Sequence, residues 1–357
     1  MDNLTLVLPL KDREFYSRRL LGYLDEICCP YPLIIADGGA KDSKIQQSIE
    51  SNYYDNLEYE YIRFPYDSSP QQFYGKIANS LLKVETPLAM MIDNDDFFTI
   101  NGLDFCTEFL RNNNDFISAR GGMTGVHIGE RGIIEREDMY TKFPDSIVGD
   151  TAQERIQNQA THFHSNWHNI TRTHALQTNW SIIWYFSPTN LRFCEQTIGF
   201  LNIVWGGGLR DASFCHIIHQ HDTPRVEGGE REVHFPDQDT WIRDKEWSYN
   251  FSGMTDAIAL AINMCEGIDF EDCRQEFRKS YMDMYVPRIS NRDLLVSKIE
   301  DSKSYCSDRR IEDIKSIISS LNPFGVGYIS EKDVPSDINE ACEKEIEELQ
   351  NFLRTMS

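Results

Sequence analysis

The chain has 357 residues and a formal net charge of −22, with 40% hydrophobic and 26% charged residues. This balance is typical of a folded globular protein with a substantial core. The sequence contains no apolar run long enough to predict a membrane-spanning helix. The negative charge disfavours nucleic acid as a partner, because phosphate binding needs clustered Lys and Arg, although a local basic patch formed by folding stays open.

The N-terminus and the cysteines indicate a cellular compartment. The first ten residues, MDNLTLVLPL, place an acid at position two and continue as a strand pattern, which is unlike a signal peptide. The nine cysteines contain no CxxC pair. We therefore expect reduced thiols and a cytoplasmic protein.

Short apolar runs alternate with segments of helical spacing over the first 95 residues. The runs predict strands at residues 4–10, 31–39, 57–65 and 87–95. The intervening segments predict helices at residues 11–27, 41–54 and 68–84, the last with Ser69 as N-cap and Pro70 in the first turn. This alternation predicts an α/β fold in which right-handed crossovers join the parallel strands of a doubly wound sheet.

Polar residues follow three of these strands, as the segments Lys11–Arg13, Asp37–Gly39 and Asp93–Asp96. The carboxyl ends of parallel strands share one edge of the sheet, so these segments are expected to converge there. Carboxylates gathered in this way repel one another unless a divalent cation lies among them, and oxygen ligands favour Mg²⁺ or Mn²⁺, which would suit a diphosphate. The alternative is an Asp-rich turn that caps the next helix.

Four features of the first hundred residues together resemble a family 2-type glycosyltransferase of the GT-A fold. They are a first strand ending in LVLPLKDR, a second ending in IIADGG, a helix with the pair Ala78-Asn79, and a strand that leads into Asp93-Asn94-Asp95-Asp96. The stretch from residue 150 to residue 226 resembles a bacterial and phage-type subgroup more weakly, through Trp167 and Arg172-Thr173. The chain departs from the family at Ala36, which stands where the first Asp of an Asp-Asp-Gly turn is usual, and from the subgroup at the three glycines 206–208, where Gly-Lys is common.

The resemblance implies transfer of a sugar from a nucleotide-sugar donor to a hydroxyl acceptor, with Mn²⁺ or Mg²⁺ as cofactor. It implies that the donor is bound by Pro9, Lys11, Arg13, Asp37, Asn79 and Asp93. The metal ligands that it implies are Asp95, Asp96 and His221. The alternative for His219 and His221 is a pair that is satisfied in the core or faces solvent.

An inverting transfer needs a base for the acceptor hydroxyl, and this base is normally a carboxylate. Glu195 matches the expected position best, because it follows a strand-like stretch and is expected to open an apolar helix. Asp211 and Asp150 are the rivals. The alternative for Glu195 is an acid that the dipole favours at a helix N-terminus.

The pattern changes at about residue 236, where helical segments take over at residues 255–267, 269–286, 307–323 and 336–356. Thr255 is expected to cap the first of them and Gly267 to end it. We therefore expect a GT-A-like domain at 1–235, with a donor half at about 1–100 and an acceptor half at about 101–235. A helical extension at 236–357 would pack on this domain or pair with another subunit in a homo-oligomer.

Several functional alternatives stay open. A nucleotidyltransferase with a related sheet would carry a Gly-rich, Arg-bearing loop after the first strand, which LPLKDREF lacks. A non-catalytic nucleotide-sugar-binding protein and a glycosyltransferase for modified phage DNA are the others. Because the net charge opposes a polyanion, we expect a neutral or weakly charged glycan acceptor, placed by aromatic faces among Trp167, Trp180, Trp184 and Trp205.

Overall fold

The computed structural model describes residues 3–41, 43–129, 132–139, 146–161, 163–221, 238–304, 308–321 and 337–355. Its strands are β1 (Leu4–Leu10), β2 (Leu33–Asp37), β3 (Tyr59–Arg63), β4 (Leu88–Met91), β5 (Phe97–Phe98), β6 (Phe116–Gly129), β7 (Gly132–Met139), β8 (Ile170–Arg172) and β9 (Gly207–Gln220). Its helices are α1 (Glu14–Glu26), α2 (Lys44–Glu50), α3 (Pro70–Leu81), α4 (Ile100–Asn112), α5 (Ala152–Thr161), α6 (Thr173–Phe186), α7 (Leu191–Val204), α8 (Gln238–Trp241), α9 (Trp247–Glu266), α10 (Phe270–Tyr285), α11 (Arg292–Asp301), α12 (Asp308–Leu321) and α13 (Ile338–Thr355), with a 3₁₀ turn at Val286–Arg288.

One mixed sheet runs through the molecule in the order β3-β2-β1-β4-β8-β6-β9-β5, and β7 pairs with β6. The first four strands pair in parallel, which confirms the doubly wound arrangement predicted from the alternation of strands and helices. Beyond β4 the pairing changes, because β8 is antiparallel to both β4 and β6. The N-terminal α/β unit therefore continues into a second part of the sheet that the alternation did not predict.

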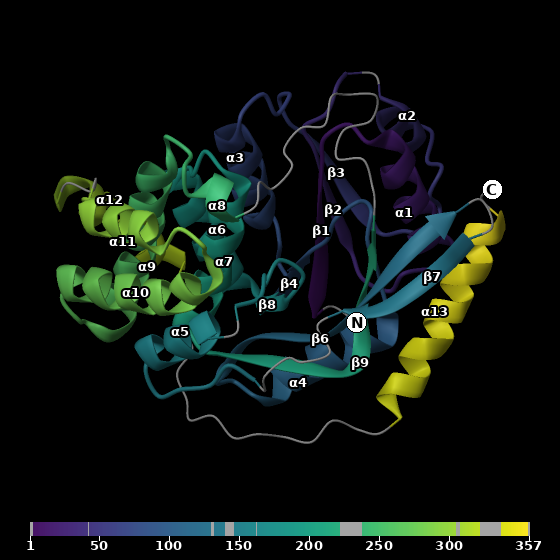
Figure 1. Ribbon diagram of the computed structural model, residues 1–357. Coiled ribbons are helices and arrows are strands. Elements are labelled where there is room, and N and C mark those ends of the chain that lie inside the picture. The colour runs from purple at the N-terminus through teal and green to yellow at the C-terminus, as the bar shows by residue number, and fades with distance from the viewer. Residues whose placement is uncertain are drawn as a thin grey trace.

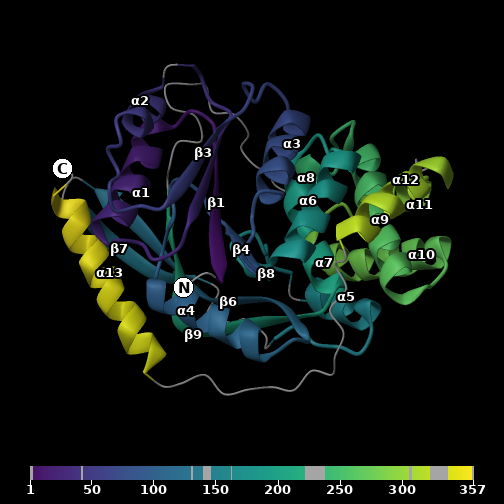
Figure 2. The ribbon, with the colours of Figure 1, turned by 180° about the vertical axis from the view of Figure 1, so that it is seen from behind.

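Helices cover both faces of the sheet, as the two opposite views show (Figures 1 and 2). The side chains of β1 alternate between two cores: Leu6 and Leu8 join one, and Val7 joins the other. A strand buried on both faces needs mostly apolar residues, which explains the run at 4–10; its polar member, Thr5, shares a hydrogen bond with the Thr86 hydroxyl. The helix predicted to follow β3 begins as expected, because Ser69 Oγ accepts a hydrogen bond from Gln72 N and Pro70 occupies the first turn.

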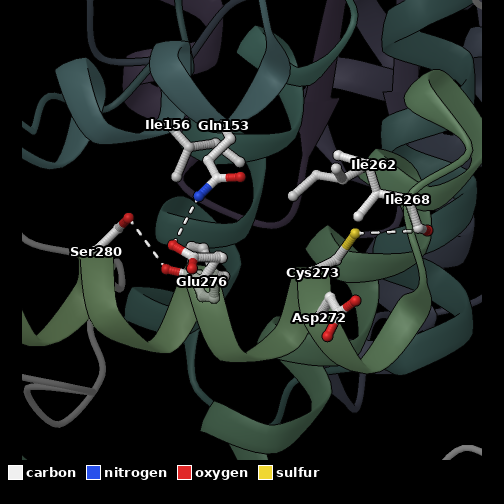
Figure 3. A pocket seen from close by; sticks show the side chains of 9 residues that line it. Gln153, Ile156, Ile262, Ile268, Asp272, Cys273, Glu276 and Ser280 are labelled. Carbon is white, nitrogen blue, oxygen red and sulfur yellow. Dashed lines mark hydrogen bonds between the residues drawn. The ribbon is translucent and has the colours of Figure 1, made fainter.

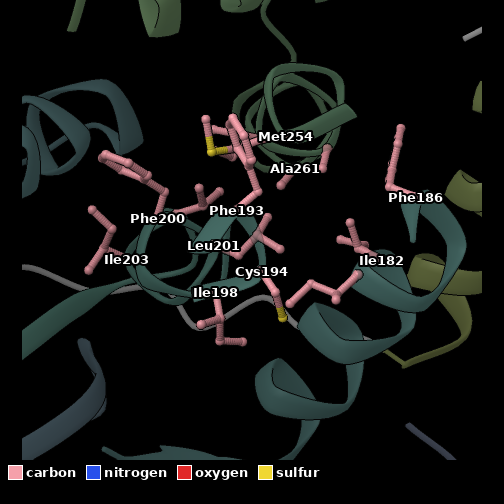
Figure 4. Packing of buried hydrophobic residues seen from close by; sticks show 14 of the residues in the cluster. Ile182, Phe186, Phe193, Cys194, Ile198, Phe200, Leu201, Ile203, Met254 and Ala261 are labelled. Carbon is pink, nitrogen blue, oxygen red and sulfur yellow. The ribbon is translucent and has the colours of Figure 1, made fainter. Parts of the chain in front are cut away.

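The larger core lies where α6, α7 and α9 pack together beside the sheet (Figure 4). Phe193 and Leu201 of α7 lie against Met254 and Ala261 of α9. The prediction that Thr255 caps a helix is wrong: α9 begins at Trp247, and the Thr255 hydroxyl donates inside the helix to the Phe251 carbonyl. The aromatic segment at 247–251 is the first part of α9 and not a loop before it. Gly267 ends the helix as predicted, with φ of 72°.

The C-terminal helices divide between the two sides of the sheet. Helices α9 to α12 lie on the side of α3 and α6, whereas α13 lies beside β7 and α1 on the other side (Figures 1 and 2). The apolar stripe of α13 belongs to the core that holds β1, and it consists of Cys342, Ile346, Leu349 and Leu353. The division of the chain at residue 236 therefore stays a proposal. Across the described ranges, no helix has both the length and the apolar character needed to cross a bilayer.

Candidate functional site

The point where the strand order reverses lies between β1 and β4, and the candidate site is built around the carboxyl ends of these two strands. Arg13 follows β1 and Asp95 follows β4, and their side chains meet with an Nη2–Oδ2 distance of 2.7 Å. The segments predicted to converge from separate parts of the chain therefore do so. Ligands of open α/β sheets bind at such reversal points.

Asp93, Asp96 and His168 form a group able to hold a metal ion. One ligand atom from each residue lies within 4.8 Å of the others. His168 Nε2 lies 3.2 Å from Asp96 Oδ2 and 3.6 Å from Asp93 Oδ2. Two carboxylates and one imidazole are a donor set suited to Mn²⁺ or a similar divalent ion, so the residues fit the cation predicted from the sequence.

Sheet pairing explains how residues so distant in the sequence meet. β8 runs antiparallel to β4, with Ala89 opposite Thr171, so the residues before β8 return to the end of β4. This places His168 beside the β4 backbone, with its Nδ1 3.4 Å from the Met91 carbonyl. β5 pairs with β9 in the same way, which brings the end of β9 next to Asp96.

Hydrogen bonds fix both carboxylates of the group. Asp93 Oδ1 accepts from the indole N–H of Trp167 at 3.1 Å. Asp96 Oδ1 lies 2.9 Å from His219 Nδ1 and accepts from the Gln220 backbone N–H at 3.2 Å. The other carboxylate oxygen of each residue faces His168. Partners of this kind orient metal ligands in proteins.

The two carboxylates differ in their electrostatics. Burial raises the pKa of Asp93, and the charges of Asp95 and Asp96 act in the same direction against the charge of His168. Burial also opposes ionisation of Asp96, but hydrogen bonds from His168 and His219 outweigh it and hold the pKa of Asp96 well below its usual range. The same contact with Asp96 raises the pKa of His219. Of the two carboxylates, Asp96 therefore ionises more readily than Asp93.

The end of β2 supplies a second polar cluster, centred on Asp37. Its carboxylate accepts from Gly39 N–H and from the Tyr61 hydroxyl, each at 2.7 Å, and pairs with Arg63 at 2.6 Å. Only 4% of the Asp37 side chain is exposed. Gly39 is required here, because a Cβ would lie 2.9 Å from the backbone nitrogen of Asp12 in the turn after β1. The turns after β1 and β2 are thus packed against each other.

A buried ion pair contacts the end of β1, next to these turns. Lys76 Nζ lies 2.5 Å from Asp67 Oδ2 and donates to the Leu10 carbonyl at 2.7 Å. The motif residue Asn79 lies three positions further along α3, on its exposed side, and donates to the Gly75 carbonyl of its own helix. Sequence reasoning missed Lys76, although helical spacing places it on the buried face of α3 with Ile77 and Ser80.

The other residues expected to bind the donor or the metal lie around these clusters. Pro9 is in β1 beside Ala36, and Lys11 lies over the exposed ring of Tyr66 at 5.3 Å. His221 lies 3.0 Å from Glu137, and its ring contacts that of His219, which is the histidine paired with Asp96. The structure thus gathers Asp93, Asp96, His168 and His219, whereas the sequence assigned the metal to Asp95, Asp96 and His221.

Neither principal candidate for the base has been brought into this group. The prediction that Glu195 opens its helix is wrong, because α7 begins at Leu191 with Asn190 as N-cap, which places Glu195 in the second turn. Its charge acts on Cys194 and Tyr74, in the helical layer. Asp211 accepts a hydrogen bond from Ser213 N–H at 2.8 Å within an irregular part of β9. The rival Asp150 precedes α5 and donates its backbone N–H to Glu154.

A small cavity lies away from the sheet edge, between α5, α9 and α10 (Figure 3). Its volume of about 30 Å³ holds one or two waters and no sugar. The polar groups around it bond to each other: Gln153 donates to Glu276 at 2.7 Å, and Ser280 donates to the Glu276 carbonyl at 3.2 Å. We regard it as a packing defect.

No protein-family model matches the chain, and no curated protein matches its sequence. Solved structures do match. The crystal structure of S. aureus TarS 1-349 is similar with a TM-score of 0.54 and 12% identity, over 96% of this chain and 92% of that one. The fold is GT-A-like.

Two further TarS structures agree with this GT-A-like assignment. The complex of TarS 1-349 with UDP has a TM-score of 0.50 at 12% identity, over 96% of this chain and 92% of that one. A longer TarS structure has a TM-score of 0.52 at 10% identity, over 99% of this chain and 55% of that one. The chain thus spans about half of the longer TarS structure. These matches confirm the fold that the sequence motifs predicted.

Proposed function

We propose that the protein is a metal-dependent glycosyltransferase that takes a nucleotide-sugar donor at the reversal point of its sheet. The observation that carries this proposal is the group of Asp93, Asp96 and His168 at that point. The GT-A-like fold supports it, since TarS, a family 2 glycosyltransferase of this fold, has been crystallised with UDP. A uridine diphosphate sugar is therefore the donor class to test first.

In this proposal the metal ion is held by Asp93, Asp96 and His168, and His219 orients Asp96. When bound, such an ion neutralises the charge that develops on the nucleoside diphosphate leaving group. Asp37, held by Arg63 and Tyr61, stays a proposed contact to the nucleoside. These assignments keep Asp37 as a donor contact and Asp96 as a metal ligand, and they propose Asp93 and His168 as metal ligands in place of Asp95 and His221.

We propose a neutral or weakly charged glycan as the acceptor. The tryptophans considered for it have different environments: Trp180 and Trp205 are buried in the core, whereas Trp167 contacts Asp93 and Trp184 is 41% exposed. Trp167 and Trp184 are therefore the two that suit contact with a sugar face. The net charge of −22 opposes a polyanionic acceptor. Parallel transfer assays on oligosaccharide and duplex DNA across a salt series would separate the two classes.

We keep Glu195 as the proposed base for the acceptor hydroxyl. If it takes the acceptor proton, Glu195→Gln keeps donor affinity and lowers transfer by about 10²-fold. Normal transfer by this variant would move the role to Asp211 or Asp150, or to a mechanism without such a base.

The proposal is tested by calorimetry of UDP binding with and without Mn²⁺. We expect Mn²⁺-dependent binding in the wild type and a loss of at least about tenfold in Asp96→Asn, because the ionised carboxylate of the group is gone. Asp283→Asn is the matched control, since it makes the same chemical change at an exposed position of α10. A UDP affinity that changes neither with Mn²⁺ nor in Asp96→Asn would contradict the proposed site.

A further inference from the structure

The turn after β1 has an unusual backbone. Asp12 and Arg13 are consecutive non-glycine residues with positive φ, at 53° and 56°. L-residues rarely adopt this left-handed conformation, and residues held in it cluster at ligand clamps and switch regions. The turn therefore stays in place only because other contacts hold it.

Two sets of contacts hold the turn, one at each residue. The Asp12 carboxylate accepts from the Ala40 N–H and from the Tyr66 hydroxyl, both at 3.1 Å. Arg13 is held by its 2.7 Å pair with Asp95, and its guanidinium lies over the Tyr16 ring at 4.9 Å. The first set anchors the turn to the segments that follow β2 and β3, whereas the second depends on Asp95, which lies between Asp93 and Asp96 in the sequence.

Asp95 belongs electrostatically to the metal group, although its carboxylate is turned toward Arg13. Its charge acts on Asp93, His219 and Arg19. The Arg13–Asp95 pair is mostly buried, with 17% and 13% of the two side chains exposed. Arg13 also has a spare donor, because its buried Nε–H makes no hydrogen bond among the described residues.

We propose that Arg13 is an exchangeable counter-ion that guards Asp95 until the donor binds. With no ligand present, the guanidinium neutralises Asp95 and opposes entry of a bare divalent ion. When the diphosphate arrives with its cation, Asp95 turns to the cation and Arg13 to the phosphate oxygens. The site would thus admit the metal and the nucleotide together. This inference rests on the proposed function and describes how that site is regulated.

Charge balance favours the exchange. Arg13 and a divalent cation repel one another, so they share Asp95 poorly while no other anion is present. A diphosphate supplies negative oxygens to which a guanidinium bonds strongly, often through two N–H groups at once. Release of the pair also frees the left-handed turn to relax, which gives the device two distinct arrangements.

The first experiment uses Mn²⁺ alone, with binding to the full chain measured by electron paramagnetic resonance. We expect Arg13→Ala to bind Mn²⁺ about tenfold more tightly than the wild type, because a nearby positive charge is removed. Arg13→Lys should stay close to the wild type, since it keeps that charge. Arg18→Ala is the control: it removes the same charge from an exposed position of α1 and should change nothing.

The second experiment measures UDP affinity at saturating Mn²⁺. Here we expect the opposite sign, with Arg13→Ala weakened by about ten- to a hundredfold because a charge-assisted contact to phosphate is lost. Exchange of the counter-ion therefore predicts that one variant binds Mn²⁺ more tightly and UDP more weakly than the wild type. Mn²⁺ affinity that is unchanged or reduced in Arg13→Ala would overturn the inference, as would unchanged UDP affinity.

The two proposals fail in distinguishable ways. If neither the wild type nor Arg13→Ala binds Mn²⁺, or if Asp96→Asn binds Mn²⁺ as well as the wild type does, then the metal site itself is wrong and the inference falls with it. If Asp96→Asn abolishes Mn²⁺ binding while Arg13→Ala leaves it at the wild-type level, the site stands and only the role of Arg13 is refuted. A change in the circular dichroism of Arg13→Ala would identify misfolding, and Arg13→Lys then carries the test. We expect Arg13→Lys to bind Mn²⁺ like the wild type and UDP more weakly than the wild type, because an ammonium lacks the two-pronged fork of the guanidinium; unchanged UDP affinity in this variant would overturn the inference.

Discussion

Buried carboxylates have different kinds of partners at the sheet edge and in the helical layer. In the helical layer, Asp256 of α9 is fully buried, pairs with Arg274 of α10 at 2.7 Å and accepts from Ser304 at 3.0 Å. At the sheet edge, Asp93, Asp95 and Asp96 share His168, His219 and Arg13. The first set is a fixed pair between two packed helices. The set at the sheet edge is a cluster of three carboxylates, and its partners belong to loops and strand ends.

The comparison shows how a structural ion pair differs from a ligand site. A buried acid that has a permanent cation and a further hydrogen bond, as Asp256 has from Arg274 and Ser304, needs no added cation. Where carboxylates outnumber the Arg and Lys side chains beside them and histidines supply the remaining positive charge, an added cation stabilises the ionised carboxylates. Perturbed carboxylates with such specific partners are also what functional sites tend to contain. Stability and binding should therefore separate when each region is mutated.

The largest expected effect concerns the helical layer. Arg274→Ala leaves the carboxylate of Asp256 buried without its cation, and breaking such a pair costs about 3–5 kcal/mol of the free energy of unfolding. Urea denaturation measures this change. We expect Mn²⁺ affinity per folded molecule to stay at the wild-type level.

The matched control is the exposed pair between Arg111 and Glu108 on α4, whose side chains are 54% and 59% exposed. Arg111→Ala should cost well under about 1 kcal/mol, because solvent screens such pairs. A loss in Arg274→Ala no larger than in this control would show that Asp256 finds another partner or water, and would remove the contrast between the two regions.

The next effect in size distinguishes the sequence-based ligand from the structural one. His219→Ala removes the partner that orients Asp96, so we expect Mn²⁺ affinity to fall by about tenfold with little loss of stability. His221→Ala removes a ring that pairs with Glu137 instead, and its effect should be clearly smaller. Calorimetry with Mn²⁺ measures both. A larger loss in His221→Ala would restore the assignment made from the sequence.

The fold was largely predictable because its first part is local and periodic. The runs that became β1, β2 and β4, and the Ser69–Pro70 start of α3, carry their own signals of burial and capping. Alternation of these elements then forces parallel pairing. Strands β8 and β5, which pair antiparallel with β4 and β9, had no such signal, because β8 has only three residues and β5 only two. Strands this short are defined by their partners.

The site was predictable to the same extent and for the same reason. The acids after β4 could be found, since a buried strand that ends in carboxylates is conspicuous. His168 could not be chosen from the sequence, because its place beside Asp93 depends on the antiparallel pairing of β8 with β4. Choosing His219 over His221 requires the register of β5 against β9, which places Ile218 opposite Phe97. Alternation along a strand predicts the face of a residue but not its partner.

A half-buried acid, Glu345 of α13, gives the smallest expected effect. It accepts from Asn101 Nδ2 at 2.7 Å and from the Asn101 backbone N–H at 3.2 Å, and no cation is among its described contacts. Burial, with the charge of Glu348 acting in the same direction, raises the pKa of Glu345 from 4.5 to about 7. An acid with a raised pKa binds its proton more tightly in the folded state. Its contribution to stability is therefore fully present below pH 4.5 and is lost as the pH rises through 7.

Docking of α13 should accordingly weaken between pH 5 and pH 8 in the wild type, and Glu345→Gln should remove this component because its amide does not titrate. Hydrogen exchange of the α13 amides, compared between the two proteins at both pH values, measures the difference and cancels the titration of every other group. We expect the variant to protect α13 better than the wild type at pH 8, with the advantage shrinking or reversing at pH 5. The same difference at both pH values would show that Glu345 titrates as an ordinary surface acid. In that case partial burial without a cation would not suffice to perturb an acid in this protein.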